Sequence, residues 1–272
     1  MANKGTIANR LSELKDICIE RMETLGLKHG EDFFCDGIYL VGIQNYGLSN
    51  EKSRVDAKMV VLPSIRKVLR NERIYYDFSI EGKSRVDIKF PTGTLKSIFY
   101  GSNQGLEILA TDYFLPGTYV ELLKKEGVLD EITNAIIGSI WEDSLGCMSN
   151  KLYRLINPTP SETDCFKRVG YDTKDISHAF KLAGFLENLY NGLTFKESID
   201  LNNTVYQQMF FEVRDCKFSI TKAEHEVRQA IKVVERRIDM FKDDGVKTHK
   251  LKEKCFDIYV SMMEEKFNQK GV

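Results

Sequence analysis

A six-residue segment with an arginine, an aspartate and a lysine at every second position occurs twice in the first hundred residues. These residues are Arg54, Asp56 and Lys58 in the first copy and Arg85, Asp87 and Lys89 in the second. Side chains alternate between the two faces of a strand, so the three charged residues of each copy share one face. If the two strands are neighbours, two carboxylates and four cations meet on one polar surface. That surface is either a binding site or a solvated sheet face, and the alternation alone favours a solvated edge strand.

The elements that must position these residues are predicted from hydrophobic periodicity. Strands are expected at 33–43, 55–62, 73–80 and 85–90, and helices at 6–26, 65–71, 94–100, within 118–153 and at 173–191. Glu81 and Gly82 have the composition of a hairpin turn between the third and fourth strands. The final seventy residues are mostly helical. The pattern predicts an α+β fold in which a helical region follows the strands.

Three domains are expected, with boundaries at 1–115, 116–202 and 203–272. The last is predicted to be an antiparallel helical hairpin that turns at Asp243, Asp244 and Gly245, because apolar residues recur at spacings of three and four on both sides. Its many basic residues are interpreted as a solvated helix face, with an RNA-contact surface as the alternative.

The composition bounds the function. The chain has 272 residues, 39 basic and 40 acidic, and a formal charge of −1, which argues against a uniformly basic nucleic-acid coat. No apolar run approaches the roughly 20 residues that cross a bilayer, and the N-terminus shows no apolar signal core. The six cysteines are scattered and never form CxxC, so reduced thiols in a cytoplasm are expected. A Ser/His/Asp arrangement, a P-loop and a GxGxxG motif are all missing from the sequence.

Several segments, in order, resemble the polymerase-β-like nucleotidyltransferases. The resemblance spans roughly residues 38 to 192 and is closest to the bacterial and phage branch that includes RNA-repair-associated enzymes. It is carried by Val41–Leu48, Ser53–Lys58, Val60–Ser64, Val86–Lys89, Leu106–Tyr113 and Gly170–Lys174, the last followed by His178. The resemblance implies a small mixed sheet flanked by helices in the first domain, a nucleotidyltransferase-like core.

In that family, two carboxylates on one strand and a third on its neighbour hold two Mg²⁺ ions for phosphoryl transfer. Backbone amides of a glycine-bearing turn cradle the triphosphate. Carried over to this sequence, Asp56 and Asp87 take the second and third carboxylate positions as remnant catalytic residues. Gly42, Asn45 and Gly47 take the phosphate turn.

The first carboxylate position is occupied by Arg54, which departs from the family pattern. Arginine is effectively always protonated, so it cannot ligate Mg²⁺ and repels it. Residues 51–96 contain eleven basic and six acidic residues, an excess of +5 in a chain whose total is −1. We therefore expect no metal cofactor and a site that suits anionic phosphates.

Three functions are compatible with these residues. The first is a catalytically degenerate protein that binds RNA, with tRNA as the first choice, or nucleotide. Its binding residues are expected to be Gly42, Asn45, Gly47, Arg54, Lys58, Arg85, Lys89 and His178, helped by a basic helix at 66–73 beside the sheet. The second is an active, Mg²⁺-dependent nucleotidyltransferase that acts on an RNA or protein acceptor, its metal site rebuilt from residues such as Asp77 or Glu81. The third is a protein-interaction module.

The family setting implies a phage or mobile-element origin. On that analogy we expect the protein in the cytoplasm of a bacterial host, away from membranes. There it could act as a counter-defence factor, with a host protein complex as a further partner.

Overall fold

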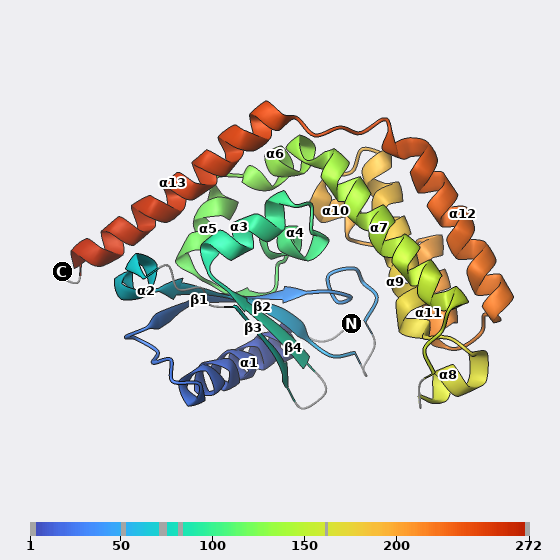
Figure 1. The fold of residues 1–272 in the computed structure, drawn as a ribbon, viewed down its shortest axis with the longest axis horizontal. Helices are drawn as coiled ribbons and strands as arrows, with labels where there is room; N and C mark the ends of the chain where they lie inside the picture. The colour runs from blue at the N-terminus through green and yellow to red at the C-terminus, as the bar shows by residue number, and fades with distance from the viewer. Residues whose placement is uncertain (1–3, 50–52, 71–74, 81–83, 161–162, 270–272) are drawn as a thin grey trace. The chain divides into compact units, whose positions relative to one another are not determined.

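The computed structural model describes residues 4–49, 53–70, 75–80, 84–160 and 163–269. The chain forms two compact units (Figure 1). The sheet unit consists of Met1–Asn45, Ser49–Ala135 and Asp244–Val272, and the helical unit consists of Tyr46–Leu48 and Ile136–Asp243. In the described ranges, no helix combines the length and apolar character that a bilayer crossing requires.

The sheet unit is built on five strands in the order β3-β4-β2-β1-β5. Their bounds are β1 Phe33–Val41, β2 Asp56–Pro63, β3 Tyr75–Ile80, β4 Ser84–Lys89 and β5 Phe114–Leu115. The β2–β4 pair is parallel and the other three pairs are antiparallel, so the sheet is mixed. The predicted small mixed sheet is therefore confirmed, as is the antiparallel pairing of the third and fourth strands. The turn expected at Glu81 and Gly82 lies outside the described residues.

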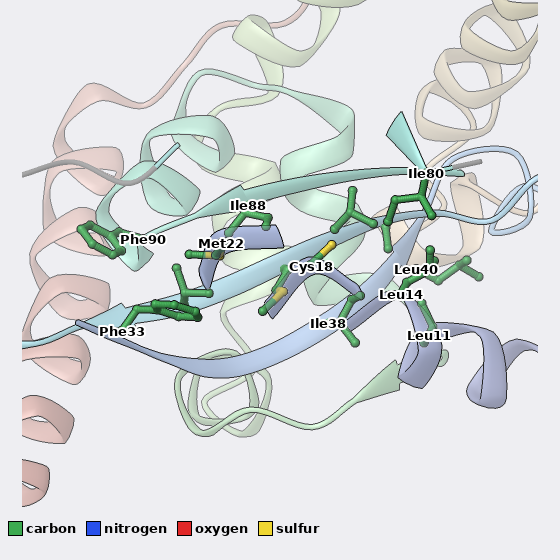
Figure 2. Close-up of a cluster of buried hydrophobic side chains, with 14 of the residues drawn as sticks. Leu11, Leu14, Cys18, Met22, Phe33, Ile38, Leu40, Ile80, Ile88 and Phe90 are labelled. Carbon is green, nitrogen blue, oxygen red and sulfur yellow. The ribbon is translucent and has the colours of Figure 1, made fainter. Parts of the chain in front are cut away.

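One face of the sheet is covered by α1, Lys4–Thr24. Its buried residues Leu11, Leu14, Cys18 and Met22 form a continuous apolar core with the side chains that β1, β2 and β4 direct toward it (Figure 2). The strand residues of that core include Ile38, Leu40, Met59, Val61, Val86 and Ile88. Because strand side chains alternate, the residues between them point to the opposite face.

The opposite face of the sheet lies beneath short helices (Figure 1). The remaining helices of this unit are α2 Ile65–Leu69, α3 Pro91–Phe99, α4 Asn103–Ala110, α5 Thr118–Lys125, α6 Val128–Ala135 and α13 Gly245–Gln269. Helix α3 begins at Pro91, which is well tolerated at the first helical position because that residue needs no N–H donor. Helix α3 contacts β2 and β4, α4 and α5 contact β1, and α13 packs on α3, α5 and α6.

The helical unit comprises α7 Ile137–Ile156, α8 Asp164–Val169, α9 Thr173–Tyr190, α10 Phe195–Ser198, α11 Val205–Arg214 and α12 Ile220–Ile238. Helix α9 lies at its centre and contacts α7, α10, α11 and α12. Its N-terminus is capped by Asp172, whose carboxylate accepts a hydrogen bond from the Lys174 amide at 2.8 Å. The Trp141 ring is fully buried and stacks on Phe241 with the ring centroids 4.6 Å apart.

The C-terminal helices differ from the predicted hairpin. Helix α12 packs on α7 and α9 in the helical unit, whereas α13 packs on helices of the sheet unit. The contact pattern thus assigns 203–243 and 244–272 to different units. Each helix has an apolar stripe, but a stripe does not specify which surface will cover it.

Candidate functional site

The two charged segments found in the sequence lie side by side on β2 and β4. The strands are parallel, with Asp56 opposite Arg85 and Lys58 opposite Asp87. An alignment of the two copies would place Asp56 beside Asp87. The observed register is shifted by two residues from that alignment. The offset keeps all the charged side chains on one face while it sets each aspartate opposite a basic residue of the other strand. Both strands are interior to the sheet, so the interpretation of these charges as protection of an edge strand was wrong.

Asp87 is held between two lysines at the buried end of this charged row. Its Oδ2 lies 3.1 Å from Lys58 Nζ and 3.2 Å from Lys89 Nζ. The Lys89 ammonium also donates to Ser97 Oγ on α3 at 3.0 Å. Only 7% of the Lys58 side chain is exposed, and burial lowers the pKa of Lys58 while Asp87 opposes that shift. This is a desolvated ion-pair triad.

Asp56 is held at the more exposed end of the same face. Its Oδ1 lies 3.4 Å from Arg54 Nε and accepts a hydrogen bond from the Arg85 backbone N–H at 3.1 Å. The Arg85 guanidinium is directed to Asp77 on β3, where Nε lies 2.8 Å and 2.9 Å from the two carboxylate oxygens. That hydrogen bonding holds the pKa of Asp77 below its usual value. Asp77 is therefore engaged as well, and Glu81 lies outside the described residues.

The glycine turn follows β1 at the same end of the sheet. Gly42 has a φ of +89°, which favours glycine, and a Cβ at this position would lie 3.9 Å from the Asp56 side chain. The Gly42 N–H donates to Glu107 Oε2 at 2.5 Å. Asn45 Nδ2 donates to the same oxygen at 3.3 Å and to the Leu40 carbonyl at 3.0 Å. The Gly42 N–H and the Asn45 side-chain amide, which would face a phosphate at this turn, thus already donate to the Glu107 carboxylate.

Glu107 also belongs to this site, although it was not among the residues predicted from the sequence. It belongs to α4, its side chain is fully buried, and its Oε1 has no hydrogen-bond partner among the described residues. Its charge also raises the pKa of Lys58, which links it electrostatically to the lysine–aspartate triad. An acidic residue inside the otherwise apolar segment 106–110 was the available signal.

The remaining two predicted residues, Gly47 and His178, belong to the helical unit. The Gly47 carbonyl accepts a hydrogen bond from Gln207 Nε2 at 3.0 Å, and the Asn202 side chain fills the space where a Cβ would stand. His178 is half-buried on α9. Burial, together with Lys181, Lys151 and Lys174, lowers the pKa of His178 well below its usual value. His178 therefore lies in a cationic environment within its own unit.

The carboxylates of the site do not fit a pair of metal ions. Two buried carboxylate oxygens, Asp87 Oδ1 and Glu107 Oε1, have no described hydrogen-bond partner, which alone would suit a cation. Lys58 and Lys89, however, stand within 3.2 Å of the other Asp87 oxygen. Across the described ranges, no group of three or more His, Cys, Asp or Glu side chains has an arrangement that could hold a metal ion. No metal-dependent step follows from these residues.

Access to the charged face differs along its length. The side chains of Arg85 and Arg54 are 61% and 37% exposed. Lys58 and Lys89 lie beneath Thr94 and Ser97 of α3, and among the described side chains the space between them is too small for a water molecule. The exposed cations of this surface are thus the two arginines at the N-terminal ends of β2 and β4.

The basic helix expected beside this surface lies elsewhere. Helix α2 begins directly after the C-terminal end of β2, while Arg54 precedes its N-terminal end. A strand of this length separates the two by about 26 Å at a rise of about 3.3 Å per residue. Arg66 and Arg70 therefore do not extend the Arg54 and Arg85 surface, and Arg73 lies outside the described residues.

Comparison with known proteins finds similarity to solved structures. No family model matches the chain, and no curated protein matches it. The structure of a nucleotidyltransferase-like protein from Exiguobacterium sibiricum 255-15 is similar to it with 13% sequence identity and a TM-score of 0.33, over 76% of this chain and 69% of that chain.

Proposed function

We propose that this protein is a nucleotidyltransferase-type protein without metal catalysis, which binds RNA phosphates through the strand-end arginines Arg54 and Arg85. The observation that carries the proposal is the two-residue offset between β2 and β4. It brings Lys58 beside Asp87, while Asp56 pairs with Arg54 and the Arg85 guanidinium pairs with Asp77, so the carboxylates are engaged by the protein's own cations. Such a face neutralises its acids internally and leaves Arg54 and Arg85 as its more exposed cations.

The charge balance supports an anionic partner. Among the described residues between 53 and 96 there are eight basic and three acidic side chains; three of the basic ones belong to α2 and its end, so the excess nearer the strand-end arginines is +2. Local excess of this kind attracts phosphate backbones even where the chain as a whole is neutral. Among phosphate ligands the geometry favours RNA over a nucleoside triphosphate, because Glu107 already occupies the Gly42 amide. The tRNA class is the first to test.

The active-enzyme alternative requires both remnant carboxylates to leave their cations and a third ligand to join them. Asp77, the nearest candidate, is itself bound to Arg85. For the cellular location and the biological role, we follow the resemblance found in the sequence. We propose the cytoplasm of a bacterial host as the location and counter-defence as the role.

The binding proposal predicts a defined salt dependence. The affinity of wild-type protein for a single-stranded RNA should fall with salt, and each phosphate contact should contribute a logarithmic slope of about −0.7. Arg85→Glu should weaken binding and flatten the slope by about one contact, equally for all sequences, because the contact is to the backbone. Fluorescence anisotropy across a salt series measures both quantities.

Arg236→Glu is the matched control, since it reverses an exposed arginine on α12 in the other unit. It should leave the slope unchanged. Loss of binding in Arg236→Glu with wild-type behaviour in Arg85→Glu would move the site to α12. Absence of RNA binding at low salt would remove the proposal and favour a protein partner.

A further inference from the structure

A groove of about 930 Å³ runs between α3 and α13 in the sheet unit, away from the charged face of β2 and β4. Leu95 and Phe99 of α3 are buried and contribute apolar surface to it. The other lining residues are Thr92, Lys96, Tyr100, His249, Lys252, Glu253, Phe256 and Asp257. Its volume is at the upper end of the range for small-molecule sites, about 300–1,000 Å³.

Two large aromatic side chains of this groove are left in solvent. Tyr100, which directly follows α3, is 68% exposed and Phe256 on α13 is 48% exposed. A ring of this size normally gains free energy by burial, so two exposed rings from separate segments on one groove form a surface suited to a ligand. Flat rings are the groups on which nucleobases stack.

Each wall of the groove also carries a lysine close to an aromatic ring. Lys96 Nζ lies 5.6 Å from the Tyr100 ring centroid, and Lys252 Nζ lies 5.4 Å from the Phe99 ring centroid. Cations near aromatic rings are the combination with which proteins hold the phosphates and bases of a single strand. Glu253 and Asp257 add carboxylates, which can accept hydrogen bonds from the exocyclic amino groups of bases.

The polar side chains of the groove favour a nucleotide ligand over an apolar peptide. Half of its ten lining residues carry a charged or imidazole side chain, with cations on both helices. An amphipathic peptide helix would place an apolar face against such a groove and bury those polar side chains. A nucleotide can stack its base on the rings and place its phosphate beside the lysines.

We propose that the groove between α3 and α13 binds one or two nucleotides of single-stranded RNA, with the bases stacked on Tyr100 and Phe256. This inference rests on the proposed function, because it takes RNA as the ligand. It adds a second surface of the protein, which contacts the bases of the RNA. Phosphates would contact Lys96 and Lys252. The two surfaces make different contacts, so they can be tested separately.

The test uses the full chain and a fluorescein-labelled oligoadenylate pentamer, with an abasic pentamer of the same length as the second probe. Tyr100→Ala and Phe256→Ala should each weaken oligoadenylate binding roughly 5- to 150-fold, the range for loss of one stacked base. Tyr100→Phe should bind as wild type, because it keeps the ring. The abasic pentamer should bind wild type and Tyr100→Ala alike.

Tyr153→Ala is the matched control, since Tyr153 is 64% exposed on α7 in the helical unit. It should leave both probes unaffected, and melting curves would verify that each variant is folded. Wild-type binding by Tyr100→Ala and Phe256→Ala would overturn the groove proposal while leaving the Arg85 result intact. Weakening by the aromatic variants without an Arg85 effect would support the groove and overturn the strand-end site. No binding of either probe would overturn both and leave a protein partner.

Discussion

Replacing Asp87 with asparagine is expected to lower the free energy of unfolding by about 3 kcal/mol. The change removes the negative charge shared by Lys58 and Lys89 and leaves an ammonium stranded in the interior, which typically costs about 3–5 kcal/mol when burial is complete. Lys58 is 7% exposed and Asp87 is 19% exposed, so the low end of that range applies. Urea unfolding of wild type and variant measures the difference.

Asp77→Asn is the matched control for Asp87→Asn on the neighbouring strand, because Asp77 lies directly opposite Asp87 in the β3–β4 pair. Its partner Arg85 is 61% exposed, so this ion pair should contribute no more than about 1 kcal/mol. The double variant Lys58→Met with Asp87→Asn should recover most of the loss, since the stranded cation is then absent. Equal effects of the two single variants would show that Asp87 is not held in a desolvated triad.

The same triad predicts a direction for pH dependence. Burial lowers the folded-state pKa of Lys58, so between that value and the unfolded-state value near 10.5 the unfolded chain binds more protons. The lysine therefore contributes increasing stability as pH rises through that window. Removal of Asp87 lowers the folded-state pKa further. The deficit of Asp87→Asn should accordingly shrink as pH is raised from neutrality toward the lysine range.

The second large effect is expected for Glu107→Ala, also about 3 kcal/mol of unfolding free energy. The variant removes the acceptor for Gly42 N–H and for the Asn45 amide, and it leaves a cavity beside α4. A buried donor without a partner costs about 1–3 kcal/mol, and the cavity adds to that cost. Thermal or urea unfolding measures the change.

Two further substitutions separate the causes. Glu107→Gln keeps an oxygen for the Gly42 N–H, so it should lose less stability than Glu107→Ala. Gln104→Ala lies on the exposed side of α4 and should have little effect. If Glu107→Ala is as stable as Gln104→Ala, Glu107 does not hold the glycine turn and would not compete with a triphosphate there.

Much of the sheet unit could be predicted from local patterns. The apolar run Ile38–Val41 is typical of a buried strand, and β1 contains it in the interior of the sheet. The charged alternation in 84–89 predicts a strand with one apolar face, and Val86 and Ile88 are buried on that face. These features depend on residues close in sequence, which is why periodicity detects them.

The register and the covering of the charged face could not be predicted in that way. The two-residue offset between β2 and β4 is set by contacts between strand residues that are 29 positions apart in the sequence. Lys58 belongs to a pattern typical of a solvated face, yet α3 packs over it and buries it. Glu107 gains its partners only when α4 meets the turn after β1. Each of these features depends on tertiary packing, which no local pattern contains.

The central question is whether the remnant carboxylates pair with cations of the protein or bind metal ions. Calorimetric titration of the full chain with Mn²⁺ tests this most directly, and it should be done in the presence and absence of a nucleoside triphosphate. Arg54→Asp provides the comparison, because it restores a carboxylate at the first family position. Since Lys58 and Lys89 neutralise Asp87 and Arg54 contacts Asp56, we predict no saturable Mn²⁺ binding by the wild type under either condition. Tight binding of two Mn²⁺ ions per wild-type chain would contradict the account and support an active nucleotidyltransferase.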